Sequence, residues 1–178
     1  MVLSAAPIMD PQIKPILAAL EKNYAALPQE YQGQAAVVLP ADKLIACATE
    51  LKETHAFEML NALSAVDYWP QTEPRFHVIY QFLSLAKNLR LEVRVPLVGD
   101  QPSIESLTSV YSVANWFERE LWDMFGIKTE NHPDLRRILM PADWEGHPLR
   151  KDYPLDYEEV QFSFNFEEIE QRKPRPTN

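Results

Sequence analysis

Large aromatic and arginine side chains are concentrated in one stretch of the sequence, residues 116–157. Three of the four tryptophans lie in it, together with two tyrosines and four arginines. These residue types are enriched at the energetic centres of protein–protein interfaces, because each buries a large area and keeps a polar group. The composition therefore predicts a docking surface for another protein. The alternative is that the rings close the core of the chain's own domain, an interpretation that we favour for Trp116 taken alone.

Two carboxylates, Glu118 and Glu120, lie on a predicted helix within this stretch. Glu120 follows Val113 by seven residues and Trp116 by four, a spacing that puts it within or beside the apolar face of the helix. A buried carboxylate is costly unless it is paired with a cation or a hydrogen-bond donor. We hypothesise that both carboxylates hold the following segment against the helix or clamp a partner; the alternative is that both are solvated. The candidate cations are Arg136, Arg137 and Arg150.

Other kinds of chemistry find little support in the sequence. The four histidines show no pair one helical turn apart, and a mononuclear metal site at Asp143, Glu145 and His147 is less favoured than solvated or capping roles. The chain has four glycines and no G-x-G-x-x-G, and no serine lies in a G-x-S-x-G motif. The single cysteine, Cys47, cannot form an internal disulfide or an iron–sulfur site, which needs about four thiolates. We expect Cys47 to be a small buried residue on a helix.

Net charge and hydropathy exclude further classes. The formal charge of −9 disfavours a nucleic-acid binder, because phosphate recognition requires a basic face. The arginines of residues 116–157 are also interspersed with carboxylates, and such mixed charge favours a protein partner. No apolar run approaches the roughly 20 residues that span a bilayer. Residues 1–10 lack the basic and apolar segments of a signal or transit peptide.

The spacing of apolar residues predicts the elements that position this stretch. Helices are expected at 11–24 and 44–51, with strands at 35–39, 60–69, 75–85 and 89–95. Pro96 is expected to end the last strand, and residues 99–102 form a turn cluster. A short helix is predicted at 103–111 and a stronger one at 113–125, ended by Gly126. Prolines interrupt residues 127–154, and so long an irregular segment is typical of a binding region.

Residues 115–127, NWFERELWDMFGI, resemble the signature E-R-E-x-x-D-x-F-G of the NuoC-type (C-type) subunit family of proton-translocating NADH:quinone oxidoreductase, respiratory complex I. The continuation is also similar: His132-Pro133, LRRIL at 135–139, Asp143-Trp144, Gly146 and PLRKDYP at 148–154. Upstream, LSAVDY at 63–68 is similar to the central hairpin of the family. The resemblance covers about residues 11–157.

The resemblance implies an α+β fold: a two-layer domain with a mostly antiparallel sheet packed on helices, plus an extended irregular C-terminal arm. It implies a hydrophilic-arm protein that supports electron transfer from NADH to quinone, coupled to proton translocation, by docking the large hydrogenase-like D-type subunit, with the B-type and I-type subunits as neighbours. No catalytic, cofactor or metal site is expected here, because NADH, FMN, iron–sulfur clusters and quinone would be bound by other subunits. The chain would associate peripherally with the cytoplasmic side of the bacterial inner membrane, through partners alone.

The resemblance also assigns an interface, carried over by position. The expected interface residues are Glu118, Arg119, Glu120, Trp122, Asp123, Arg136, Arg137, Trp144, Arg150, Lys151, Asp152 and Tyr153. We divide the chain into a core at 1–100, a helix pair and arm at 101–157, and an acidic then basic tail at 158–178 that we expect to be partner-bound, or disordered in isolation. The open alternatives are the equivalent subunit of a membrane-bound hydrogenase or ferredoxin-linked complex, and a small independent enzyme.

Overall fold

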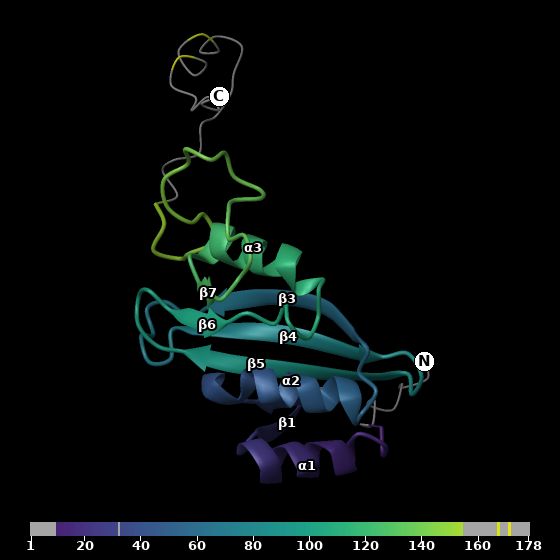
Figure 1. The fold of residues 1–178 in the computed structure, drawn as a ribbon. Helices are drawn as coiled ribbons and strands as arrows, with labels where there is room; N and C mark the ends of the chain where they lie inside the picture. The colour runs from purple at the N-terminus through teal and green to yellow at the C-terminus, as the bar shows by residue number, and fades with distance from the viewer. Residues whose placement is uncertain (1–9, 32, 155–166, 168–170, 172–178) are drawn as a thin grey trace, which may run out of the picture.

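The structure, a computed structural model, describes residues 10–31, 33–154, 167 and 171. Its centre is a five-stranded sheet in the order β1-β2-β5-β4-β3 (Figure 1). All neighbouring strands are antiparallel except β2 and β5. The sheet is therefore mostly antiparallel, as predicted. Its strands are β1 (Leu27–Tyr31), β2 (Gln34–Val38), β3 (Met59–Asp67), β4 (Phe76–Ser84) and β5 (Leu89–Leu97).

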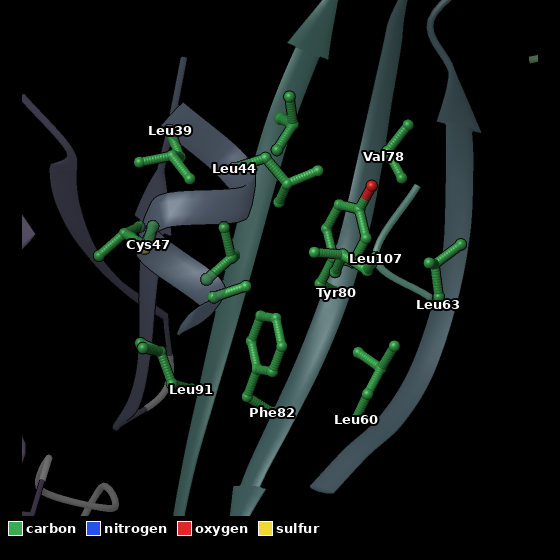
Figure 2. Packing of buried hydrophobic residues seen from close by; sticks show 14 of the residues in the cluster. Leu39, Leu44, Cys47, Leu60, Leu63, Val78, Tyr80, Phe82, Leu91 and Leu107 are labelled. Atoms are coloured by element: carbon green, nitrogen blue, oxygen red, sulfur yellow. The ribbon is translucent and has the colours of Figure 1, made fainter. Parts of the chain in front are cut away.

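One face of the sheet carries the hydrophobic core. Side chains alternate strictly along β4 and β5, and every second residue is buried. The helices α1 (Lys14–Tyr24) and α2 (Leu44–Glu53) bury their apolar stripes in the same core cluster, and a short 3₁₀ turn, η1 (Ala41–Lys43), precedes α2. Figure 2 shows buried side chains of this cluster from α2, β3, β4 and β5. The fold is thus the predicted two-layer α+β arrangement.

The third helix, α3 (Ala114–Phe125), packs against β3 and begins the functional region. Its buried side contains Ala114, Glu118, Leu121 and Phe125. Val113 and Trp116 are instead 40% and 58% exposed, so they lie outside the buried face and the core role expected for Trp116 is wrong. Gly126 ends the helix with φ +71°, as predicted, and its N–H donates to the Trp122 carbonyl at 2.8 Å.

Several local predictions of strands and helices fail, for different reasons. Residues 103–111 do not form a helix: β6 (Ser103–Glu105) pairs in parallel with β7 (Lys128–Glu130), which was not predicted either. Strand β1 was missed because it contains Pro28 and is exposed throughout. Strand β5 continues through Pro96, since its pairing with β2 ends at Arg94 and a residue without an N–H is tolerated where a strand has one neighbour.

The core extends past the proposed boundary at residue 100. Ile104, Leu107, Leu121 and Ile127 belong to the same buried cluster as the strands and helices before them. The division at this position stays a prediction, and the predicted tail at 158–178 lies outside the described residues apart from 167 and 171. Cys47 is 1% exposed on α2, as expected, and burial raises the pKa of its thiol to about 12. No helix among the described residues has the length and apolar composition needed to cross a membrane.

Candidate functional site

The segment after β7, residues 131–154, is an arm that has no helix or strand in its described structure and is held by specific polar contacts. Asp123, buried on α3, makes the central one. Its Oδ2 atom accepts hydrogen bonds from the backbone N–H groups of Ile138, Leu139 and Met140 at 3.0, 2.7 and 2.9 Å. Its Oδ1 atom pairs with Arg137 at 2.6 Å. Burial opposes ionisation of Asp123, but these donors outweigh it, so its pKa lies below the usual range.

Arg137 of the arm and Arg119 of α3 make further contacts that hold the arm in place. Arg137 donates to the carbonyl oxygens of Trp144 and Gly146 at 2.7 and 3.0 Å, and its guanidinium lies over the Trp122 ring. Arg119 of α3 donates to the carbonyls of Arg136 and Arg137 at 3.1 and 3.0 Å. Its guanidinium also lies over Trp116. Helix α3 and the arm therefore form one hydrogen-bonded unit.

A second contact, which we call the Arg75 hub, ties the far end of the arm to the sheet. Arg75 is 1% exposed and pairs with Asp67, Asp100 and Asp152 at 3.0, 2.8 and 2.8 Å. The N–H of Lys151 donates to Asp67 at 2.9 Å. These groups come from the end of β3, the segment before β4, the 99–102 turn and the arm.

Hydrogen bonds keep the carboxylates of Asp67 and Asp152 ionised within the hub. Burial opposes ionisation of Asp67, but hydrogen bonds from Arg75 and from the N–H groups of Lys151 and Trp69 keep its pKa below normal. The hydrogen bond from Arg75, followed by contacts with Arg150, lowers the pKa of Asp152 to about 2. Arg150 also donates to the Asp100 carbonyl at 2.9 Å. At neutral pH both Asp67 and Asp152 are therefore ionised.

The third contact lies inside the molecule and involves Glu118. Its carboxylate, 0% exposed, accepts hydrogen bonds from the Ser106 hydroxyl at 2.6 Å and the Leu107 N–H at 2.7 Å. Burial raises the pKa of Glu118, and these two hydrogen bonds oppose that rise. Glu118 therefore fixes the segment between β6 and α3, not the arm, and none of the three predicted arginines is its partner.

His132 lies 3.9 Å from Glu118, but its hydrogen bonds identify a neutral ring. Its Nε2 is 3.1 Å from the Asn115 carbonyl, which can only accept, so Nε2 carries the proton. Its Nδ1 accepts the N–H of Asp134 at 3.0 Å, so Nδ1 carries none. The contact between His132 and Glu118 is therefore not an ion pair.

The arm also packs closely on α3 through its rings. The N–H of Leu149 donates to the Met124 carbonyl at 2.9 Å, and Nδ1 of His147 lies 3.0 Å from the Asp123 carbonyl. The His147 ring covers Gly126 so closely that a Cβ atom there would lie 2.5 Å from it. The Tyr153 ring approaches Gly146 in the same way, at 2.7 Å.

The resulting surface presents apolar side chains to solvent. Along the outer side of α3, Val113, Trp116 and Glu120 follow one another at helical spacing. Leu139, whose N–H is bound by Asp123 on the same side of the helix, is 60% exposed. Leu149, further along the arm, is 52% exposed. Glu120 is exposed, so the prediction that it is buried is wrong.

The predicted interface residues thus separate by position. Glu118 and Asp123 are buried inside the chain; Arg119, Arg137, Arg150 and Asp152 connect the arm to the rest; Glu120, Arg136 and Lys151 are exposed. Trp122, Trp144 and Tyr153 are half-buried in the packing of the arm. Among the described residues no three His, Cys, Asp or Glu side chains come together as metal ligands, including those at 143–147. Sequence reasoning missed Arg75, Asp67 and Asp100. For Asp67 a signal existed, because it falls in the buried phase of β3 with Leu63 and Ala65.

Fold and site together define an α+β chain with a structured arm and with exposed apolar side chains on α3 and on the arm. The comparisons with known proteins identify the family. The model of the respiratory-chain NADH dehydrogenase 30 kDa subunit matches residues 37–159, and the chain belongs to this family. It is 43% identical over 163 residues to the C-type subunit of NADH-quinone oxidoreductase from Roseiflexus sp. (strain RS-1), covering 87% of this chain and 93% of the relative. It is 46% identical over 124 residues to the same subunit from Trichlorobacter lovleyi, covering 70% and 76%.

Two solved structures share the fold. A trypsin-resistant fragment (1–134) of Nqo5 is 29% identical, with a TM-score of 0.63, and the match covers 70% of this chain and 99% of the fragment. A chain of the membrane-bound sulfane sulfur reductase, an archaeal respiratory complex, is 20% identical, with a TM-score of 0.73, and the match covers 85% and 94%. The second likeness concerns the fold alone.

Proposed function

We propose that this chain is a docking component of NADH:quinone oxidoreductase that binds the quinone-site D-type subunit, with the B-type and I-type subunits nearby. The observation that carries the proposal is the arm. It lacks regular structure, yet buried ion pairs and hydrogen bonds hold it in one shape, and that shape displays Leu139 and Leu149, while Trp116 of α3 is also exposed. Exposed large apolar side chains on a rigid support are what a stable protein interface requires.

In this proposal the chain supports electron transfer from NADH to quinone, and the coupled proton translocation, by assembly alone. NADH, FMN, iron–sulfur clusters and quinone are bound by other subunits. A single cysteine supports this, because a cluster needs about four thiolates. Attachment to the cytoplasmic side of the inner membrane is then through partners.

Limited proteolysis offers a first check on a role for the arm in binding. The solved Nqo5 structure is of a trypsin-resistant fragment, 1–134, so trypsin is an informative probe of this fold. In the chain described here, the exposed Arg136 offers a cleavage site within the arm. We expect trypsin to cut the free chain in the arm and a bound partner to protect it.

A pull-down from native membranes tests the proposal. Tagged wild-type chain should recover the other proteins of the complex with NADH:quinone activity, and Trp116→Ala/Leu139→Ala should reduce recovery about tenfold or more. The matched control, Leu27→Ala/Leu85→Ala, removes equally exposed side chains at 63% and 62% from β1 and the β4–β5 turn, and should recover the complex normally. Recovery of hydrogenase subunits would show that the chain belongs to a related hydrogenase complex. Recovery of the chain alone would refute docking.

A further inference from the structure

The outer side of α3 combines apolar side chains with the exposed carboxylate of Glu120. Val113, Trp116 and Glu120 are separated by three and four residues, so they form a continuous row along the helix. The exposed Leu139 lies near the end of α3, because Asp123 binds its backbone N–H. We call Val113, Trp116, Glu120 and Leu139 the α3 row.

The neighbouring arginines already have partners within the chain. Arg119 is occupied by the carbonyls of the arm and the Trp116 ring, and Arg136 pairs with Asp134 at 2.9 Å. Glu120 has no hydrogen bond or ion pair with any residue that the structure describes, and it is exposed one helical turn after Trp116. The row therefore presents a negative charge flanked by apolar groups, on a chain whose net charge is −9.

We infer that the α3 row binds an amphipathic helix of a partner protein in the complex, and that this helix carries a lysine or arginine opposite Glu120. Two helices that pack along one another make contact through residues at positions i, i+3, i+4 and i+7. Val113, Trp116 and Glu120 occupy three of these positions, i, i+3 and i+7. A partner cation would satisfy Glu120 as the interface excludes water, because a desolvated charge needs an opposite charge. This inference rests on the proposed function, and it adds the chemistry of the partner at that same surface.

Photo-crosslinking in the assembled complex identifies the partner segment. Benzoylphenylalanine at position 113 keeps Trp116 and Glu120 in place and should label a segment of another protein of the complex that has helical apolar spacing and a lysine or arginine. Labelling of an irregular or purely acidic segment would overturn the inference. Labelling of this chain's own residues 155–178 would also overturn it, because the tail would then occupy the row.

Charge variants test the role of Glu120 separately. Glu120→Arg should lower incorporation into the complex about tenfold or more, Glu120→Gln should lower it less, and reversing the labelled partner cation to glutamate should restore Glu120→Arg. Glu21→Arg, an exposed change of equal charge on α1, should have no effect. If Glu120→Arg assembles normally while Trp116→Ala/Leu139→Ala does not, docking stands and the cationic helix is refuted. If neither variant affects assembly, both proposals are refuted.

Discussion

At Gly126 the backbone and a neighbouring ring both require glycine. The residue has φ +71°, and a Cβ atom would lie 2.5 Å from the His147 ring. We expect Gly126→Ala to lower the free energy of unfolding by about 2–4 kcal/mol, from backbone strain plus displacement of His147. Urea denaturation of the isolated chain measures the loss.

Gly99 provides the control. It has φ +82°, but a Cβ atom there meets nothing within 4 Å, so Gly99→Ala reports backbone strain alone. Its cost should be about 1–2 kcal/mol. Equal losses for the two variants would show that the contact with His147 contributes nothing.

Glu118 is expected to make stability depend on pH. Its folded-state pKa is raised by burial, so its contribution is fully present below the unfolded pKa of about 4.3 and is lost as pH rises through the folded pKa. Glutamine has no charge to bury and can still bond Ser106 and Leu107. The free energy of unfolding of Glu118→Gln, minus that of wild type, should therefore increase from pH 4 to pH 7. A difference that stays constant from pH 4 to pH 7 would contradict the assignment.

Glu118 and Glu120 show why the sequence located the site but did not reveal which contacts its residues make. Both lie in the same motif, and counting from Val113 assigned burial to the wrong one. The helix turns Ala114, Glu118 and Leu121 inward because Ser106 and Leu107 supply donors at that point. That supply depends on the β6–β7 pairing, which the local apolar pattern does not reveal.

The arm is an element without regular secondary structure, so its order depends on side-chain contacts, chiefly those of Asp123. Asp123→Ala removes the acceptor for three backbone N–H groups and the partner of Arg137. Losing these bonds should destabilise the local structure by about 2–3 kcal/mol. Tryptic cleavage after Arg136 and Arg137 should then accelerate by about tenfold or more, measured by mass spectrometry over a digestion time course.

Asp134→Ala is the matched change within the same arm. Asp134 pairs with Arg136 at the surface, where both side chains are more than half exposed, and such pairs contribute little. Cleavage should stay near the wild-type rate. Equal acceleration in both variants would mean that Asp123 does not hold the arm.

The helix itself was predictable where the arm contacts were not. Apolar spacing and Gly126 defined α3 to within a residue or two, because both signals are local. The Arg75 hub joins residues 67, 75, 100 and 152, which no spacing rule connects. Arginine and aspartate at those positions were visible, but only the fold brings them together.

In the whole molecule, the Arg75 hub couples the arm to the sheet. Arg75→Met leaves Asp67 buried without its cation, which should cost about 3–5 kcal/mol and destabilise core and arm together. Asp152→Asn weakens the contact between the arm and Arg75, and Asp67 keeps Arg75. Urea denaturation should therefore show a much smaller loss for Asp152→Asn than for Arg75→Met. A comparable loss of unfolding free energy in both variants would show that the hub stabilises the protein through its contact with the arm and not through the Arg75–Asp67 pair.

Hydrogen exchange measures the arm and the sheet separately within one experiment. In Asp152→Asn the peptide 148–154 should exchange faster, because the Lys151 N–H depends on the hub, while β4 and β5 keep their wild-type protection. The low pKa of Asp152, about 2, means that the wild-type link persists from neutral pH to about pH 4 and weakens as pH falls towards 2. Wild-type protein and Asp152→Asn should therefore differ in exchange at pH 7 and converge near pH 2. Unchanged protection of 148–154 in the variant at pH 7 would mean that the arm's end is held by the packing of His147 and Tyr153 instead.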